Sequence, residues 1–270
     1  MAVTITVLAS GSRGNATLVA SSRTRILVDA GISCKETFKR LRAAGEEPER
    51  LDAILISHEH SDHVCGLPVL ARKLKLPVYM TGPCNDEWSR SFHNKEERRR
   101  QTNLGQLELF ASGRSFQIGD IQVTPFTIPH DAADPVAFTF RVEGVKVSVI
   151  TDLGYMPANV KEHLRGSDVL MIESNHDLEM LRGGPYPWSV KQRVMSRVGH
   201  LSNAALAEFF SSSYDGSAST VILAHLSEQN NHPEIARGAA ESALEPRRSL
   251  LTSNRVLLAQ QDTPLEPVRF

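Results

Sequence analysis

One stretch constrains this chain more than any other. A short apolar run, residues 53–56, is followed after one serine by residues 58–63, which read His-Glu-His-Ser-Asp-His. A run of β-forming residues that stops at a polar cluster is typical of a buried strand that delivers polar side chains to a sheet edge. Residues 64–76 have the pattern of a helix, so the cluster is predicted to form a strand-to-helix loop.

This loop carries four potential metal ligands in six positions: His58, His60, Asp62 and His63. Neutral imidazole suits zinc, and a carboxylate adds negative charge and tolerance for manganese or iron. Because one tetrahedral ion needs only three or four ligands, two imidazoles and an Asp-His pair could share two ions. The alternative is a solvated polar loop with incidental histidines, and structural context must decide between the two.

Three further predicted strands end in residues of the same chemistry. The strands at 121–129, 145–150 and 220–224 run into His130, Asp152 and His225. Asp152 could simply cap the next turn, but a carboxylate is also well suited to bridge two metal ions. His130 alone would not indicate a ligand. Its place just past a strand, like that of the first cluster, favours this role.

Composition sets broad limits on the chain. With 270 residues, of which 41% are hydrophobic, it can bury a sizeable core. We expect one domain over residues 1–270, with a core at about 3–260 and a polar tail at 261–270. The 30 basic and 31 acidic residues give a net charge of -1, so no global charge favours nucleic acid or an anionic membrane. A local basic groove remains possible.

The N-terminal residues lack the pattern of an export signal, and no apolar segment reaches the length of a membrane span. These features predict a cytoplasmic protein without membrane contact. The three cysteines are an odd number at unrelated spacings, which argues against a disulfide framework. Cys65 could approach the metals, but we expect a small buried hydrophobe.

Apolar alternation and turn residues predict the other elements, as an α/β chain. The expected strands are 3–8, 16–20, 25–28, 53–56, 77–80, 107–110, 115–118, 121–129, 136–142, 145–150, 168–172, 220–224 and 254–260. The expected helices are 33–44, 64–76, 83–101, a helix capped by Ser202 or Asn203 that runs to about 210, and 232–243 capped by Asn231.

Several polar segments have both structural and functional interpretations. The turn at 11–15 could be a hairpin connector, or its glycines, with Ser12 and Asn15, could approach a phosphate. The charged run at 95–100 could be a solvated helix face or contact a polyanion. The aromatic residues at 185–188 could pack as a loop or stack on a base.

Two histidines outside the strand-end set leave alternatives open. His200 could be structural, or its imidazole could contact a substrate or protonate a leaving oxygen. His176, beside Asp177 after a predicted strand, could equally be structural or touch the substrate.

The series His-x-His-x-Asp-His, His, Asp and His, each at a strand end, resembles the metallo-β-lactamase superfamily of binuclear metallohydrolases. Within it, the strings at 8–15, 173–177, 199–203 and 225–231 are similar to the YycJ/WalJ type. The resemblance covers about residues 3–260. It implies a four-layer αββα sandwich, and a bacterial cytoplasmic nuclease that digests DNA from a 5′ end with zinc or manganese and serves DNA repair.

Carried over to this sequence, the resemblance implies that His58, His60 and His130 hold one divalent ion, that Asp62, His63 and His225 hold a second, and that Asp152 bridges them. A hydroxide shared by the ions would attack the phosphodiester, while Asp62 or a protonated histidine such as His200 moves the proton. The candidate substrate contacts are Ser12, Asn15, His176, Ser227 and Asn230.

Two other functions use the same residues. The metals could instead hydrolyse a small thioester, lactone or cyclic phosphodiester, because specificity resides in loops that the motif does not fix. A non-catalytic scaffold is the hypothesis from another class, but it would have no need to retain seven intact ligands. The oligomeric state is not indicated by the sequence.

Overall fold

The computed structural model describes residues 3–247 and 255–270. Their strands form two seven-stranded sheets. In order across the first sheet lie β14 (Val268–Arg269), β1 (Thr4–Ala9), β2 (Ala16–Ala20), β3 (Arg25–Val28), β4 (Ala53–Leu55), β5 (Pro77–Thr81) and β6 (Gln106–Phe110). Across the second lie β13 (Arg255–Leu258), β12 (Thr220–Ala224), β11 (Val169–Glu173), β10 (Val145–Ile150), β9 (Val136–Val142), β8 (Ile121–Thr127) and β7 (Phe116–Ile118).

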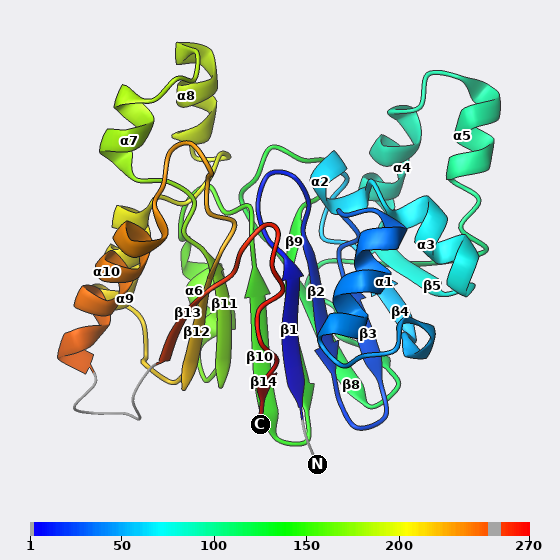
Figure 1. Cartoon of the computed structure of the whole chain (residues 1–270), viewed down its shortest axis with the longest axis horizontal. Helices are drawn as coiled ribbons and strands as arrows, with labels where there is room; N and C mark the ends of the chain where they lie inside the picture. The colour runs from blue at the N-terminus through cyan, green and yellow to red at the C-terminus, as the bar shows by residue number, and fades with distance from the viewer. Residues whose placement is uncertain (1–2, 248–254) are drawn as a thin grey trace.

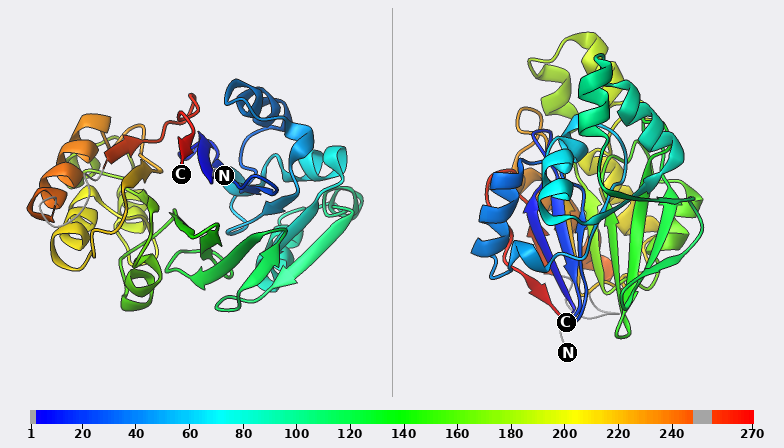
Figure 2. Two further views of the ribbon diagram at one scale, coloured as in Figure 1. Left: turned by 90° about the horizontal axis from the view of Figure 1, so that it is seen from below. Right: turned by 90° about the vertical axis from the view of Figure 1, so that its right-hand side faces the viewer.

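The sheets pack face to face between two layers of helices (Figures 1 and 2). Helices α1 (Cys34–Ala43), α3 (Leu67–Leu74) and α4 (Gly82–Arg90) pack on the outer face of the first sheet. Helices α6 (Ala158–Leu164), α9 (Asn203–Ser212) and α10 (Pro233–Leu244) pack on that of the second. The αββα sandwich expected from the sequence is therefore confirmed.

Burial on both faces explains why the central strands are continuously apolar. In β3, Ile26 and Val28 enter the core between the sheets, whereas Leu27 enters the core beneath the helices. The same alternation places Leu55 between the sheets and Ile54 under the helices.

Both sheets place the carboxyl ends of parallel strands at one edge. Strands β3, β4, β5 and β6 are parallel, as are β10, β11, β12 and β13. Residues that follow β4, β10 and β12 therefore meet at a common edge, although they are far apart in the sequence. Two helix pairs project beyond this edge on opposite sides, α4 with α5 (Lys95–Gln101) and α7 (Leu178–Gly183) with α8 (Trp188–Val194) (Figure 1).

Several predicted helix boundaries are wrong. The single helix expected at 64–76 is divided into α2 (Ser61–Val64) and α3. The break lies at Gly66, where an added Cβ would sit 2.0 Å from the Ile32 carbonyl oxygen, so the chain turns to pass Ile32 closely. The helix expected at 83–101 is divided into α4 and α5, because Asn94 caps a new helix through bonds from Glu96 N and Glu97 N.

The C-terminal part departs from expectation in two ways. Residues 261–270 were expected to be a polar tail, but β14 pairs with β1 and extends the first sheet. Helix α10 is capped by His232, whose ring accepts from Glu234 N, and not by Asn231. The Asn231 amide donates instead to the carbonyls of Ser174 and Asn175.

The final expected strand, 254–260, is observed as β13, and Asn254 lies outside the described residues. Within the described ranges, no helix is long and apolar enough to cross a membrane.

Candidate metal centre

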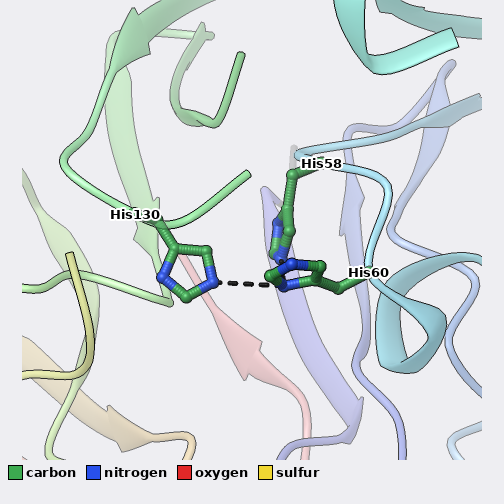
Figure 3. A group of neighbouring side chains, drawn as sticks. All are labelled: His58, His60 and His130. Atoms are coloured by element: carbon green, nitrogen blue, oxygen red, sulfur yellow. Dashed lines mark hydrogen bonds between the residues drawn. The ribbon is translucent and has the colours of Figure 1, made fainter. Parts of the chain in front are cut away.

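Three histidines converge where β4 and β8 end (Figure 3). The Nε2 atom of His58 lies 3.1 Å from Nδ1 of His60, and Nε2 of His130 lies 3.2 Å from the same atom. Two imidazole nitrogens that bind one tetrahedral zinc ion at about 2.0–2.1 Å are themselves roughly 3.3 Å apart. Both measured separations are therefore close to those that a shared divalent ion needs, and nitrogens from all three rings lie within 4.8 Å of one another.

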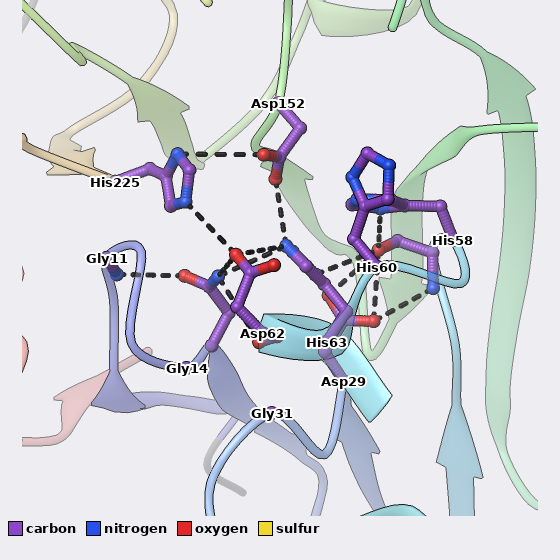
Figure 4. A network of polar contacts seen from close by, with 12 residues as sticks. Gly11, Gly14, Asp29, Gly31, His58, His60, Asp62, His63, Asp152 and His225 are labelled. Carbon is purple, nitrogen blue, oxygen red and sulfur yellow. Dashed lines mark hydrogen bonds and ion pairs between the residues drawn. The ribbon is translucent and has the colours of Figure 1, made fainter. Parts of the chain in front are cut away.

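A second group lies beside the first and contains two carboxylates (Figure 4). The Nε2 atom of His63 lies 3.1 Å from Asp152 and 3.3 Å from Asp62, and His225 Nε2 lies 3.6 Å from Asp62. Asp152 also lies 3.8 Å from His130 Nε2, so this carboxylate stands between the two groups. All seven ligands expected from the sequence are thus brought together.

Two buried atoms of the second group have no hydrogen-bond partner in the described part of the chain: Asp152 Oδ2 and His225 Nε2. Asp152 Oδ2 is the atom 3.1 Å from His63, a close charge contact without hydrogen-bond geometry. Buried polar atoms are costly when unpaired, and imidazole with carboxylate is a donor set that divalent metals prefer. The residues therefore fit divalent metal binding.

Three residues at this edge have a left-handed backbone although none is glycine. Asp29 and His225 follow β3 and β12 directly, Asp152 lies two residues after the end of β10, and their φ values are 60°, 54° and 59°. Such conformations are strained and persist where the surroundings enforce them, most often at functional sites. Here they turn the side chain that follows each strand toward the shared edge.

Further groups hold the ligand rings in place. Asp29 is buried, and its carboxylate lies 2.8 Å from Nδ1 of His63 and accepts from Ser57 N and Oγ. The ring of His130 is oriented in a similar way, since its Nδ1 lies 3.2 Å from the Gly199 carbonyl oxygen. Fixing one ring nitrogen in this way leaves Nε2 to face a metal.

Glu173, at the end of β11, orients two more histidines. Its Oε1 lies 2.8 Å from Nδ1 of His200 and 2.9 Å from Nδ1 of His225, and its Oε2 accepts from the backbone N–H groups of Leu153 and Leu201. Burial alone would raise the pKa of Glu173, but the two histidines outweigh it and lower the pKa to about 2. Glu173 could join Asp152, His200 and His225 around an ion, but four N–H donors already engage its oxygens.

The sequence interpretation assigned no role to Asp29 or Glu173. Each stands directly at the end of a predicted strand, which is the signal that identified Asp152. The signal was therefore present, but which strand ends meet cannot be known without the tertiary structure.

The histidines of the two groups differ in charge. Burial lowers the pKa of His58 and His130, which favours their neutral, metal-binding form. Burial acts in the same direction on His63 and His225, but the carboxylates beside these rings outweigh it and raise their pKa well above the usual value.

The carboxylates respond in the opposite sense. Burial would raise the pKa of Asp62 and Asp152, but the charges of His63 and His225 outweigh it, and both pKa values fall below their usual range. Without metal, protons on His63 and His225 compensate the buried carboxylates. A divalent ion would replace those protons.

Of the turn at 11–15, the structure brings Asn15 to the centre but not Ser12. Asn15 is buried, and its Nδ2 lies 3.1 Å from both Asp62 Oδ2 and His63 Nε2. Ser12 is exposed. The N–H groups of Gly11, Gly14 and Asn15 bond within the chain.

The remaining substrate candidates are buried in the supporting loops. His176 lies next to Asn175, and burial lowers the pKa of His176 to about 4. Ser227 Oγ accepts from the backbone N and Nδ2 of Asn230, which closes the turn after β12. Cys65 was expected to be buried, but it is exposed, and its thiol donates to the Gly31 carbonyl.

Comparisons with known proteins support the same assignment. Residues 24–226 match the family described as the beta-lactamase superfamily domain. The chain is 38% identical over 247 residues to a Bacillus anthracis protein named exodeoxyribonuclease YycJ. This alignment covers 92% of this chain and 91% of that protein. It is 37% identical over 230 residues to exodeoxyribonuclease WalJ of Streptococcus pneumoniae, with coverage of 85% and 84%.

A solved structure agrees at the level of the fold. The metallo-beta-lactamase fold protein YhfI of Bacillus subtilis aligns with a TM-score of 0.72 at 18% identity, over 98% of this chain and 99% of that one. The expected resemblance is therefore confirmed by the family match and by the two relatives. The chain belongs to the beta-lactamase superfamily.

Proposed function

We propose that this protein is a binuclear metal-dependent phosphodiesterase that removes nucleotides from the 5′ end of DNA. The observation that carries this proposal is the pair of adjacent ligand groups, with Asp152 of the second group 3.8 Å from His130 of the first, in a chain 38% identical to a named exodeoxyribonuclease over nearly its whole length. We further propose that the chain acts as one domain, in the cytoplasm and in DNA repair.

In this proposal, His58, His60 and His130 would hold one zinc or manganese ion, Asp62, His63 and His225 would hold a second, and Asp152 would serve as a ligand for both groups. When bound, two such ions supply an activated water and neutralise the charge of a phosphodiester. The chain contributes the fixed orientation of the ligands, through Asp29 at His63 and Glu173 at His225.

Asp62 and His200 are the proposed proton-transfer groups. Each side chain is 20% exposed, whereas those of His63, His130 and Asp152 are at most 3% exposed, so only the first two can readily exchange protons with solvent. Burial would lower the pKa of His200, but Glu173 raises it. His200 can therefore carry a proton for the leaving oxygen while Glu173 holds its Nδ1.

The direct test is digestion of 5′- and 3′-end-labelled single-stranded DNA, double-stranded DNA and matched RNA by the purified protein with added manganese. We expect stepwise loss from the 5′ end of DNA, and none with the double variant Asp62→Ala, His63→Ala. Bound metal would be counted in parallel.

Other outcomes would redirect the proposal. If every polymer survives while two ions are bound, the nuclease function fails and a small-ester or thioester hydrolase becomes the leading candidate. If RNA is cut in preference to DNA, the substrate polymer is wrong but the metal chemistry stands.

A further inference from the structure

The segment from α8 to His200 forms one wall of the metal centre. Asp131, next to the ligand His130, donates its backbone N–H to the Val198 carbonyl at 3.1 Å. His130 itself contacts the Gly199 carbonyl, and His200 N donates to Val194 O at 2.9 Å. The backbone at the end of α8 and just after it is therefore held close to the ligands.

Arg193 lies on this wall, and the Asp131 carboxylate lies between its guanidinium and the proposed ligand His130. Its Nε lies 2.5 Å from Asp131 Oδ2, and Oδ1 of the same carboxylate lies 3.4 Å from Nε2 of His130. The Arg193 side chain is 61% exposed, and its terminal nitrogens have no hydrogen bond to the part of the chain that the structure describes. These donors are free to bind a ligand that lies over the metal centre.

Arg197 lies on the same wall, against the loop that carries Asp152. Its guanidinium stacks 4.1 Å from the ring centre of Tyr155, three residues after Asp152. The backbones are equally close, since a Cβ on Gly154 would meet the Arg197 carbonyl oxygen at 2.3 Å. A stacked guanidinium keeps the N–H donors at its edge available. Arg197 is itself exposed.

We propose that Arg193 and Arg197, together called the arginine rim, bind the backbone phosphates next to the phosphodiester held at the metal centre. The planar guanidinium fork matches phosphate oxygens, and such charge-assisted hydrogen bonds are strong. The net charge of the whole chain is -1, so attraction for a polyanion must come from a local feature of this kind.

The arginine rim bears on the class of substrate and rests on the proposed phosphodiesterase function. The metals would neutralise a single phosphate, and a small cyclic phosphodiester offers no more than one, whereas a thioester or lactone group offers none. The two guanidinium groups of the arginine rim would bind additional phosphates, which only a substrate with several phosphates in series provides. The arrangement therefore favours an oligonucleotide over a small ester.

The experiment compares metal-loaded Arg193→Ala and Arg197→Ala with wild type on two substrates, single-stranded DNA and bis(p-nitrophenyl) phosphate. We expect the ratio of kcat/KM for DNA to kcat/KM for the ester to fall about ten-fold in each variant, mainly through KM for DNA. The second measurement is the binding constant of a nuclease-resistant phosphorothioate oligonucleotide at several salt concentrations. In a plot of its logarithm against the logarithm of the salt concentration, the slope should become shallower by about 0.7 for each phosphate contact removed.

Three further variants separate phosphate binding from a structural role. Arg165→Ala is the matched control, because Arg165 is similarly exposed and ion-paired with Glu162 but precedes β11, at the opposite end of that strand from the ligands. It should retain the wild-type ratio and slope. Arg193→Lys should retain most of the salt slope. Asp131→Asn breaks the ion pair but keeps the guanidinium, so it should not weaken DNA binding as Arg193→Ala does.

The inference is overturned if the rim variants keep the wild-type ratio and slope, if Arg165→Ala loses as much, or if Asp131→Asn reproduces Arg193→Ala. Thermal unfolding of each variant identifies any loss that reflects misfolding, and Arg193→Lys then decides the question. Failure of the proposed function looks different, because wild type would then hydrolyse the ester but digest no DNA.

Discussion

Glu173 supports the metal centre from outside the seven proposed ligands, since it contacts two histidines and two backbone N–H groups without facing solvent. Replacing it by glutamine keeps the shape but turns one acceptor into an amide donor. We expect Glu173→Gln to lower metal affinity by about 10–100-fold, the usual effect of losing a group that orients a metal ligand.

This prediction is checked by metal content after dialysis and by competition with a chelator. Glu179→Gln is the matched control, because Glu179 is exposed on α7 and pairs only with Arg182. A Glu173→Gln protein that retains both ions with wild-type affinity would show that Glu173 does not orient the ligands.

A second residue-scale prediction concerns pH. His63 and His225 have raised pKa values, so near neutral pH they hold protons that an ion must displace. His58 and His130 have lowered pKa values, so their rings are already neutral and can bind an ion directly. As pH falls from about 8 to about 6, the ion held by His63 and His225 should leave first.

Metal stoichiometry against pH, followed with cobalt as a spectroscopic substitute, measures this order. Loss of the ion held by His58 first, or loss of both ions together, would contradict the assignment. The sign follows from the raised pKa: affinity at the second group increases with pH until its histidines are neutral.

At the scale of elements, the strands were predicted more accurately than the helices, and burial explains the difference. The bounds of β2, β3, β9, β10 and β12 agree with the predicted ranges, because their apolar runs or hairpin turns are encoded locally. Helices α7 and α8 were not expected. They are short, and their ends depend on contacts such as Asp177 accepting from Met180 N and His200 N donating to Val194 O.

The same distinction applies to the site. The proposed metal ligands could be predicted because each follows an apolar strand. Arg193 could not, because its relation to the centre depends on the packing of α8 against Asp131. Ser12 was favoured by its glycine-rich turn, yet the N–H groups of that turn largely serve the fold itself.

Close packing between the loops after β3 and β4 gives a further prediction. A Cβ at Gly31 would lie 1.6 Å from the Asp62 carbonyl oxygen, and this contact is with backbone, which cannot move aside cheaply. Gly31→Ala should destabilise the fold by about 1–3 kcal/mol or more and lower metal content, because Asp62 is displaced.

Thermal unfolding and metal analysis test this prediction. Gly238→Ala is the control, since Gly238 is an exposed position in α10 with open space around it. That substitution should stabilise the protein by about 0.8–1 kcal/mol through helix propensity. If Gly31→Ala melts like wild type with full metal, the close approach has no energetic consequence.

At the scale of the whole molecule, the metal centre joins the two sheets. His58, Asp62 and His63 follow β4 of the first sheet, and Asp152 and His225 follow strands of the second. Bound metal should therefore stabilise the entire sandwich, by about 2.7 kcal/mol when free metal is a hundred-fold above its dissociation constant.

Differential scanning calorimetry with and without a chelator provides the measurement. The melting temperature should fall by several degrees when metal is removed, and His63→Ala should respond much less. Equal melting temperatures with and without metal would show that the folded protein does not bind metal in preference to the unfolded chain, and would contradict the proposed metal centre.

The pairing of β14 with β1 has a consequence for how the protein is made. Ser10 N donates to Gln260 O and Arg13 N to the Gln261 side chain, so the turn that carries Asn15 to the ligands is held by residues about 250 positions later in the sequence. During translation, which proceeds from the N-terminus, Gln260 and Gln261 emerge after all seven proposed ligands. The turn that follows β1 is therefore completed only after the strands that carry the other ligands have been synthesised.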